Sequence, residues 1–79
     1  MTLDQVSPQE HVRVLSLSHT GAMRRRLQEL GLVPGTVVEC VGKSPGGDPL
    51  AYLIRGAVIA IRAGDASKIE VAREGWSWD

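Results

Sequence analysis

Residues 21–36, which read GAMRRRLQELGLVPGT, decide how this 79-residue chain folds. The start of this segment predicts a helix, because its apolar side chains recur at i, i+4 and i+7 and therefore share one face. These side chains are Met23, Leu27 and Leu30. Ser18 or Thr20 can cap the start of the helix, as short hydroxyl side chains commonly do. The pattern therefore predicts a helix of about three turns with one apolar face.

The second half of the segment predicts how the helix ends and how the chain turns. Gly31 can adopt the left-handed conformation that ends many helices, and Leu32 follows it as the apolar contact of such an end. Pro34 cannot continue the helix. Pro34 and Gly35 also suit the two central positions of a type II turn over residues 33–36, where proline sets φ and glycine accepts a positive φ. We therefore expect a sharp turn before the next element.

On both sides of this segment the pattern changes to short apolar runs that are typical of strands. Five runs are expected to form strands: residues 10–18, 36–43, 50–55, 57–62 and 69–71. The apolar residues of the first run change parity, which predicts a bulge near Val14 and Leu15. Gly56 marks a tight hairpin turn between the third and fourth runs. Short strands with brief connections predict a mainly β fold, a small five-stranded barrel with a helix inserted after the first strand.

Composition indicates a single small domain. The chain is 43% hydrophobic and 23% charged, and a chain of this size buries roughly 60% of its unfolded surface, which excludes a two-domain enzyme with a cleft between lobes. Nine basic residues balance nine acidic ones, so net charge gives no general attraction to nucleic acid. No apolar run approaches the ~18 residues of a membrane span. A single cysteine, Cys40, forms no intramolecular disulfide, so we expect a cytoplasmic protein.

The last residues differ from the rest of the chain. Periodicity stops after Val71, yet both tryptophans, Trp76 and Trp78, follow it. We expect one folded domain over residues 1–73 and a C-terminal tail over residues 74–79. Two interpretations of the tail stay open: a mobile end or one that folds back on its own barrel, and an arm that binds a neighbouring subunit or a partner, since tryptophan is enriched at interfaces.

No residue pattern predicts catalysis, a metal site or a cofactor. Residues 42–44, Gly-Lys-Ser, resemble the end of a phosphate-binding loop, but Val37 stands where that motif needs glycine. His11, His19 and Cys40 do not stand at the spacings of metal ligands. We expect both histidines to face solvent and the cysteine to be a small buried residue. No nucleophile is paired with a base, so we expect no enzyme.

Three consecutive arginines, Arg24, Arg25 and Arg26, form the largest charge cluster. They step ~100° apart around the predicted helix and therefore fan across its exposed side. A solvated helix face is the simplest interpretation of such a run. Phosphate binding is a second interpretation, but a nucleic-acid binder would need interleaved aromatic residues, and this chain holds one tyrosine and two tryptophans. Docking against an acidic protein partner therefore ranks above nucleic acid.

Three stretches of the sequence resemble the FeoA family, small cytosolic proteins associated with bacterial ferrous iron uptake. They are GAMRRRLQELGLVPGT at residues 21–36, SPGGDP at residues 44–49, and RGAVIAIR at residues 55–62 followed by Ile-Glu-Val at residues 69–71. The resemblance implies an SH3-like barrel with a helical insertion. It also implies a non-enzymatic partner of FeoB, the membrane Fe(II) transporter with a cytosolic GTP-binding domain.

Most positions that match the family have a structural explanation in turns or packing. These positions are Leu27, Leu30, Gly31, Leu32, Pro34, Gly35, Pro49 and Gly56. Asp48, which precedes Pro49, is expected to hydrogen-bond within its own loop. Seven residues of the helix and the loop are left as candidates for partner binding, beside any apolar rim between helix and barrel. They are Arg24, Arg25, Arg26, Pro45, Gly46, Gly47 and Asp48.

The leading hypothesis is a regulatory module that engages the cytosolic GTP-binding part of an FeoB-type transporter. Such a module would be recruited to the inner face of the plasma membrane without inserting into it. Two rival hypotheses stay open: a small barrel that binds nucleic acid, and a metal-sensing or iron-carrying domain like the barrels of iron-dependent repressors. Either a monomer or a homo-oligomer is compatible with the sequence.

Overall fold

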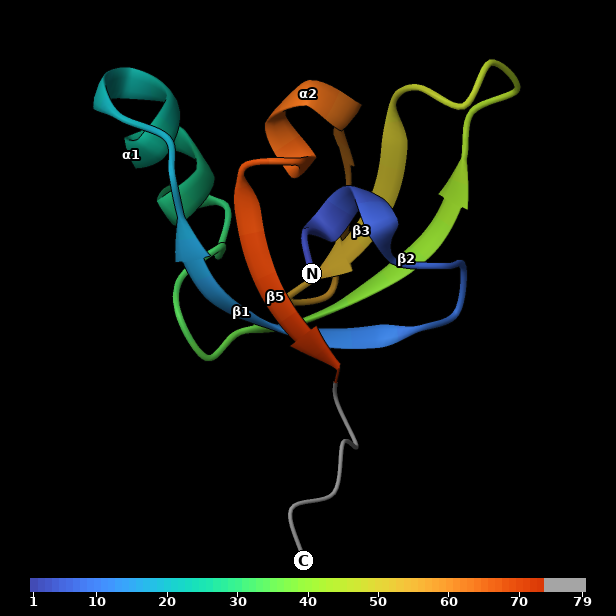
Figure 1. Ribbon diagram of the computed structural model, residues 1–79, viewed down its shortest axis with the longest axis horizontal. Helices are drawn as coiled ribbons and strands as arrows, with labels where there is room; N and C mark the ends of the chain where they lie inside the picture. The colour runs from blue at the N-terminus through green and yellow to red at the C-terminus, as the bar shows by residue number, and fades with distance from the viewer. Residues whose placement is uncertain (74–79) are drawn as a thin grey trace, which may run out of the picture.

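Five short antiparallel strands form one curved sheet in the computed structural model, which describes residues 1–73 (Figure 1). The strands are β1 His11–Leu17, β2 Val37–Lys43, β3 Leu50–Ile54, β4 Ala57–Ile61 and β5 Ile69–Arg73. Their order across the sheet is β4-β3-β2-β1-β5, so β4 and β5 are its two edges. The helical segments are η1 Leu3–Gln5, α1 Gly21–Glu29 and α2 Ala63–Ala66. The predicted mainly β fold, with a helix inserted after the first strand, is confirmed.

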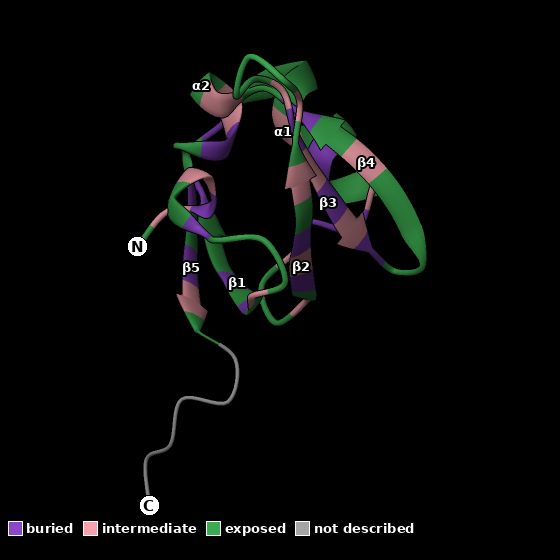
Figure 2. Cartoon of the chain, turned by 90° about the vertical axis from the view of Figure 1, so that its right-hand side faces the viewer, coloured by how far each residue is buried: buried purple, intermediate pink, exposed green. Residues whose placement is uncertain are grey.

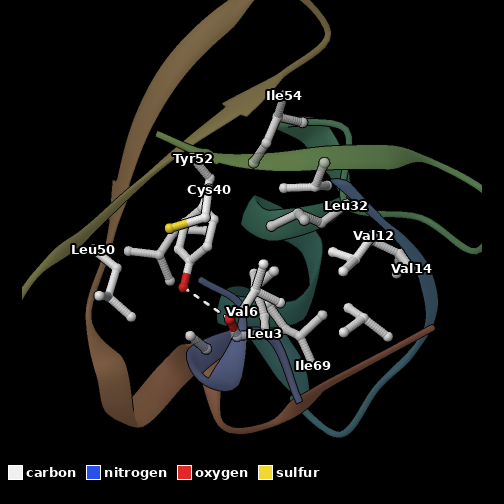
Figure 3. Close-up of a cluster of buried hydrophobic side chains, with 14 of the residues drawn as sticks. Leu3, Val6, Val12, Val14, Leu32, Cys40, Leu50, Tyr52, Ile54 and Ile69 are labelled. Atoms are coloured by element: carbon white, nitrogen blue, oxygen red, sulfur yellow. Dashed lines mark hydrogen bonds between the residues drawn. The ribbon is translucent and has the colours of Figure 1, made fainter. Parts of the chain in front are cut away.

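The core lies inside the curve of the sheet, where the buried residues of Figure 2 face one another. Side chains alternate in direction along each strand, and those that point inward form the core. In β3, for example, every second side chain is buried. Segments η1, α1 and α2 each add a buried side chain from outside the sheet: Leu3, Leu27 and Ala66. Aliphatic residues dominate this core, as Figure 3 shows, and Cys40 is buried among them as predicted.

Tyr52 is the aromatic residue at the centre of the core, and its side chain is fully buried. Its hydroxyl donates a hydrogen bond to the Leu3 carbonyl over 3.1 Å, which is the dashed line in Figure 3. Burial raises the pKa of the Tyr52 hydroxyl well above its ordinary value of 10.0, and nearby Cys40 and Asp4 add to this shift. The Tyr52 hydroxyl therefore stays neutral, and its hydrogen bond links η1 to β3.

Strand β1 carries the predicted bulge. Its register against β5 shifts between Val14, which pairs with Val71, and Ser16, which pairs with Glu70. The extra residue is Leu15, whose side chain is 49% exposed, while Val14 stays buried. The bulge thus keeps the inward side chains on one face of a strand whose sequence changes parity.

The end of α1 confirms the predicted stop signal. The Leu32 N–H donates to the Leu27 carbonyl over 3.0 Å, and the Gly31 N–H donates to the Gln28 carbonyl over 3.0 Å. Gly31 has a φ of +106°, and Leu32 is fully buried. This pair of bonds satisfies carbonyls that the last helical turn leaves free, and it directs the chain back to the sheet.

Two tight turns contain the glycines that were predicted to form them. Thr36 N–H donates to the carbonyl of Val33 over 3.1 Å, and Gly35 between them has a φ of +95°, as a type II turn requires. Arg55 and Gly56 form the two-residue turn between β3 and β4, with φ values of +50° and +83°. Positive φ at both positions is the signature of the turn whose twist matches a hairpin.

The described part of the chain ends with β5. Within residues 1–73, no helix has the length and hydropathy needed to cross a membrane. The tail expected at residues 74–79, with Trp76 and Trp78, lies outside the described residues.

Candidate partner-binding groove

Three segments gather along one end of the barrel: α1, α2 and the loop between β2 and β3 (Figure 1). At this end a groove of about 300 Å³ separates α1 from β4. Its lining comes from α1 and the residue that follows it, from β4 and from the start of α2. The lining residues are Met23, Arg26, Leu27, Leu30, Ile59, Ala60, Ile61, Arg62 and Asp65. We call this feature the α1–β4 groove.

The floor of the α1–β4 groove is apolar. Leu27 and Ile61 are buried core residues, and the half-buried Leu30 and Ile59 pack against that core. Met23, one turn before Leu27 on the same helix face, remains 40% exposed at the rim. The helix face predicted from the sequence is therefore divided, because its end packs into the core while its start borders an open groove.

The rim of the groove carries a net positive charge. Arg26 on α1 and Arg62 after β4 are both exposed, and their guanidinium groups form no ion pair with another residue in the range 1–73. Asp65 adds one carboxylate, which lies beside His19. Two cations that have no ion partner among the described residues, above an apolar floor, favour a ligand that has both apolar and acidic side chains.

The three consecutive arginines have different surroundings. Arg24 is half-buried, and its guanidinium donates to the Leu17 carbonyl over 2.7 Å and to the His19 carbonyl over 3.4 Å. The expectation that all three fan across the exposed side of the helix is therefore wrong for Arg24, whose side chain links α1 to the end of β1. Arg25 and Arg26 are exposed, and of the two Arg26 lines the groove.

His19 is buried, contrary to the expectation that both histidines face solvent. Its side chain is 3% exposed, and its Nε2 lies 3.5 Å from Oδ1 of Asp65. Within residues 1–73 neither ring nitrogen makes a hydrogen bond. The cause is tertiary, because the fold brings His19 beside Asp65 of α2, and the Ser18 N–H donates to the carbonyl of Lys68, after α2, over 2.9 Å. His11 is exposed as expected, near Glu39.

Asp48 also departs from expectation. Its Oδ1 accepts a hydrogen bond from the N–H of Ala63 over 3.0 Å, so it caps the start of α2 instead of its own loop. The side chain of Arg62 at the N-cap position supplies no such bond. Ser44 closes the loop, since its Oγ donates to the Pro49 carbonyl over 3.0 Å. Asp48 thus fixes the loop beside the end of the groove that Arg62 lines.

The other loop candidates, Pro45, Gly46 and Gly47, are exposed at the tip of the β2–β3 loop. The structure does not place them in the lining of the groove. Sequence reasoning missed Arg62 and Asp65, which the return of the chain from β4 into α2 brings opposite Arg26. One local signal could have indicated Arg62: it follows Ile61 at the end of an apolar strand, so a cation stands next to a buried residue.

The described residues show no arrangement of metal ligands. Across residues 1–73, no three side chains of histidine, cysteine, aspartate or glutamate are grouped as a metal ion would need. Cys40 is fully buried, and its Sγ lies 3.9 Å from the Gly42 carbonyl. The chemistry that the groove offers is therefore apolar contact combined with two guanidinium donors.

Comparisons with known proteins agree with this architecture. The family model of the FeoA domain matches residues 1–73. The solution structure of iron(II) transport protein A from Clostridium thermocellum superposes with a TM-score of 0.90 at 33% identity, over 95% of this chain and 46% of that one. FeoA of Stenotrophomonas maltophilia, complexed with zinc, superposes with a TM-score of 0.80 at 36% identity, over 91% of this chain and 89% of that one.

The Stenotrophomonas protein is described as an SH3 domain protein, and the predicted SH3-like barrel is thereby confirmed. A curated relative from Porphyromonas gingivalis is a fusion of Fe(2+) transport protein A with the Fe(2+) transporter FeoB. It is 31% identical over 71 residues, which are 90% of this chain. The chain spans 8% of the length of that relative.

Proposed function

Because this chain belongs to the FeoA domain family, we propose that it is a non-enzymatic accessory protein of ferrous iron uptake that acts by binding an FeoB-type transporter. The fusion protein of Porphyromonas gingivalis supports this partner, since it carries an FeoA part and an FeoB part in one polypeptide. A covalent link raises the effective concentration of one module at the other, which favours modules that bind each other. The cytosolic GTP-binding part of the transporter is the proposed contact.

The α1–β4 groove is the observation that carries this proposal. It combines an apolar floor with two cations that are unpaired among the described residues, and both features are typical of a surface that binds a protein segment with apolar and acidic side chains. Arg26 is the member of the arginine cluster placed to make this contact. Arg24 acts indirectly, because it fixes the position of α1 through the Leu17 carbonyl.

The β2–β3 loop forms a second part of the proposed surface. Asp48 joins this loop to Ala63, the residue that follows Arg62 at the groove. Pro45, Gly46 and Gly47 lie exposed beyond it. A partner larger than the groove would therefore contact the loop tip as well, while Asp48 serves to hold the loop in place.

A titration of this chain against the whole FeoB-type transporter of its organism, held in lipid nanodiscs, tests the proposal. Arg26→Glu should weaken binding about 3- to 10-fold, because it removes one favourable charge pair and adds a repulsive one. Arg25→Glu is the matched control, since Arg25 is also exposed on α1 but does not line the groove. Its affinity should stay within about twofold of the unchanged chain. Absence of binding, or equal losses from both variants, would contradict the proposal.

A further inference from the structure

One wall of the α1–β4 groove is the open edge of the sheet. Four consecutive residues, Ile59, Ala60, Ile61 and Arg62, line the groove at and just after β4. Successive side chains of a strand point to opposite faces, so a pocket against one face meets alternate residues. A pocket that meets consecutive residues runs along the edge of the strand. The groove therefore exposes the backbone of β4 as well as its side chains.

The register of the β3–β4 hairpin shows which backbone groups face the groove. Ile54 pairs with Ala57 directly across the two-residue turn, so this is the hydrogen-bonded closing pair. Hydrogen-bonded pairs alternate along an antiparallel ladder. The N–H and C=O groups of Val58 and Ala60 consequently point away from β3. Because β4 has no other neighbour in the described sheet, these groups have no strand partner.

The opposite edge of the sheet is covered by the chain itself. The Val71 N–H on β5 donates to the Met1 carbonyl over 2.8 Å, and Thr2 forms a bridge with Glu70. Edge strands without such cover are usually protected by charged residues or proline. β4 reads Ala-Val-Ile-Ala-Ile, and Val58 is 65% exposed. Among residues 1–73, nothing covers or protects the edge of β4, which lies at the border of the sheet in Figure 2.

We propose that the α1–β4 groove binds an extended segment of the partner, which adds to β4 as a sixth strand. A strand pairs with the free groups of Val58 and Ala60, whereas a helix satisfies its own backbone and would leave them unpaired. Side chains of the added strand alternate in direction. Those that face Met23 and Leu27 would be apolar, and those that face the guanidinium groups at the rim would be acidic. This inference rests on the proposed function, and it specifies the form in which an FeoB-type transporter is bound.

Amide exchange in the complex tests the inference directly. Hydrogen–deuterium exchange of the whole chain is measured by mass spectrometry, free and bound to the same transporter in nanodiscs. The amides of Val58 and Ala60 are expected to exchange readily in the free chain and at least about tenfold more slowly in the complex. Binding without added protection in the peptide over residues 57–61 would overturn strand addition and leave the proposed function standing. Absence of binding would overturn both.

A proline substitution provides the second arm. Ala60→Pro removes an N–H that has no strand partner, and proline is tolerated on an edge strand at such a position. We expect the variant to fold, with an unchanged circular dichroism spectrum, and to lose about tenfold or more in affinity. Ala60→Val is the comparison variant, because it also enlarges the side chain in the groove but keeps the N–H; it should lose clearly less affinity than Ala60→Pro. A folded Ala60→Pro variant with full affinity would overturn the inference.

A second copy of this chain is the alternative occupant of the edge. Protection of Val58 and Ala60 that rises with the concentration of the free chain, together with a dimer by sedimentation, would show pairing between copies. That result would overturn the proposal of a partner strand.

Discussion

Alanine at Gly31 should destabilise the fold more than alanine at Gly35. Both glycines have positive φ, +106° and +95°, which costs any other residue about 1–2 kcal/mol. An added Cβ at Gly31 would also lie 2.8 Å from Cδ of Arg55 and 3.2 Å from Cγ2 of Ile54. The arginine can move aside, but Ile54 is buried, so crowding adds about 1–2 kcal/mol and the total reaches about 2–4 kcal/mol.

Gly35 is the matched control, because no heavy atom lies within 4 Å of its added Cβ and the backbone cost acts alone. A chain of this length has a free energy of unfolding of about 4–12 kcal/mol, so a loss of about 2–4 kcal/mol is a large and measurable part of it. Urea unfolding followed by circular dichroism measures the two losses. Equal losses would refute the close approach of α1 to the β3–β4 hairpin, and with it the packing that holds the two walls of the α1–β4 groove together.

Two further predictions concern side chains that join distant segments. Asp48→Ala should lower the free energy of unfolding by about 0.5–2 kcal/mol, because α2 loses its cap, while Asp48→Asn should keep most of it; thermal unfolding of both variants checks this. Tyr52 has a raised pKa in the folded chain, so its contribution to stability is complete below pH 10 and falls as pH rises beyond it. Tyr52→Phe should lower the free energy of unfolding by about 0.5–1.5 kcal/mol at pH 7. Between pH 9 and 11 its free energy of unfolding should fall less than that of the unchanged chain, as measured by urea titrations. An equal fall in both proteins would contradict the assignment of this alkaline effect to Tyr52.

The elements were predictable because their signals are local. The stop at Gly31, the turn at Gly35 and the bulge at Val14 each depend on a few consecutive residues whose conformation or parity is restricted. The hairpin at Gly56 belongs to the same class. Such features need no knowledge of what lies elsewhere in the chain, so sequence alone indicates them.

The groove and its supports were harder to predict, because each depends on residues that meet through the fold. Asp48 caps a helix that begins 15 residues later, and Arg24 reaches back to a carbonyl at the end of β1. His19 is buried because α2 lies beside its loop. Arg62 joins Arg26 at one rim only after β4 has crossed the molecule. No pattern within a short window specifies these contacts, so sequence reasoning identified the arginine cluster but not the groove that Arg26 lines.

Photo-cross-linking tests most directly whether the α1–β4 groove is the surface that binds the transporter. A benzoylphenylalanine replaces either Met23, which is 40% exposed at the groove, or Leu15, which is 49% exposed on a surface that β5 and Met1 help to line. After irradiation with the FeoB-type transporter in nanodiscs, we expect a covalent product from position 23 and none above background from position 15. A product from position 15 and none from position 23 would contradict the assignment of the groove.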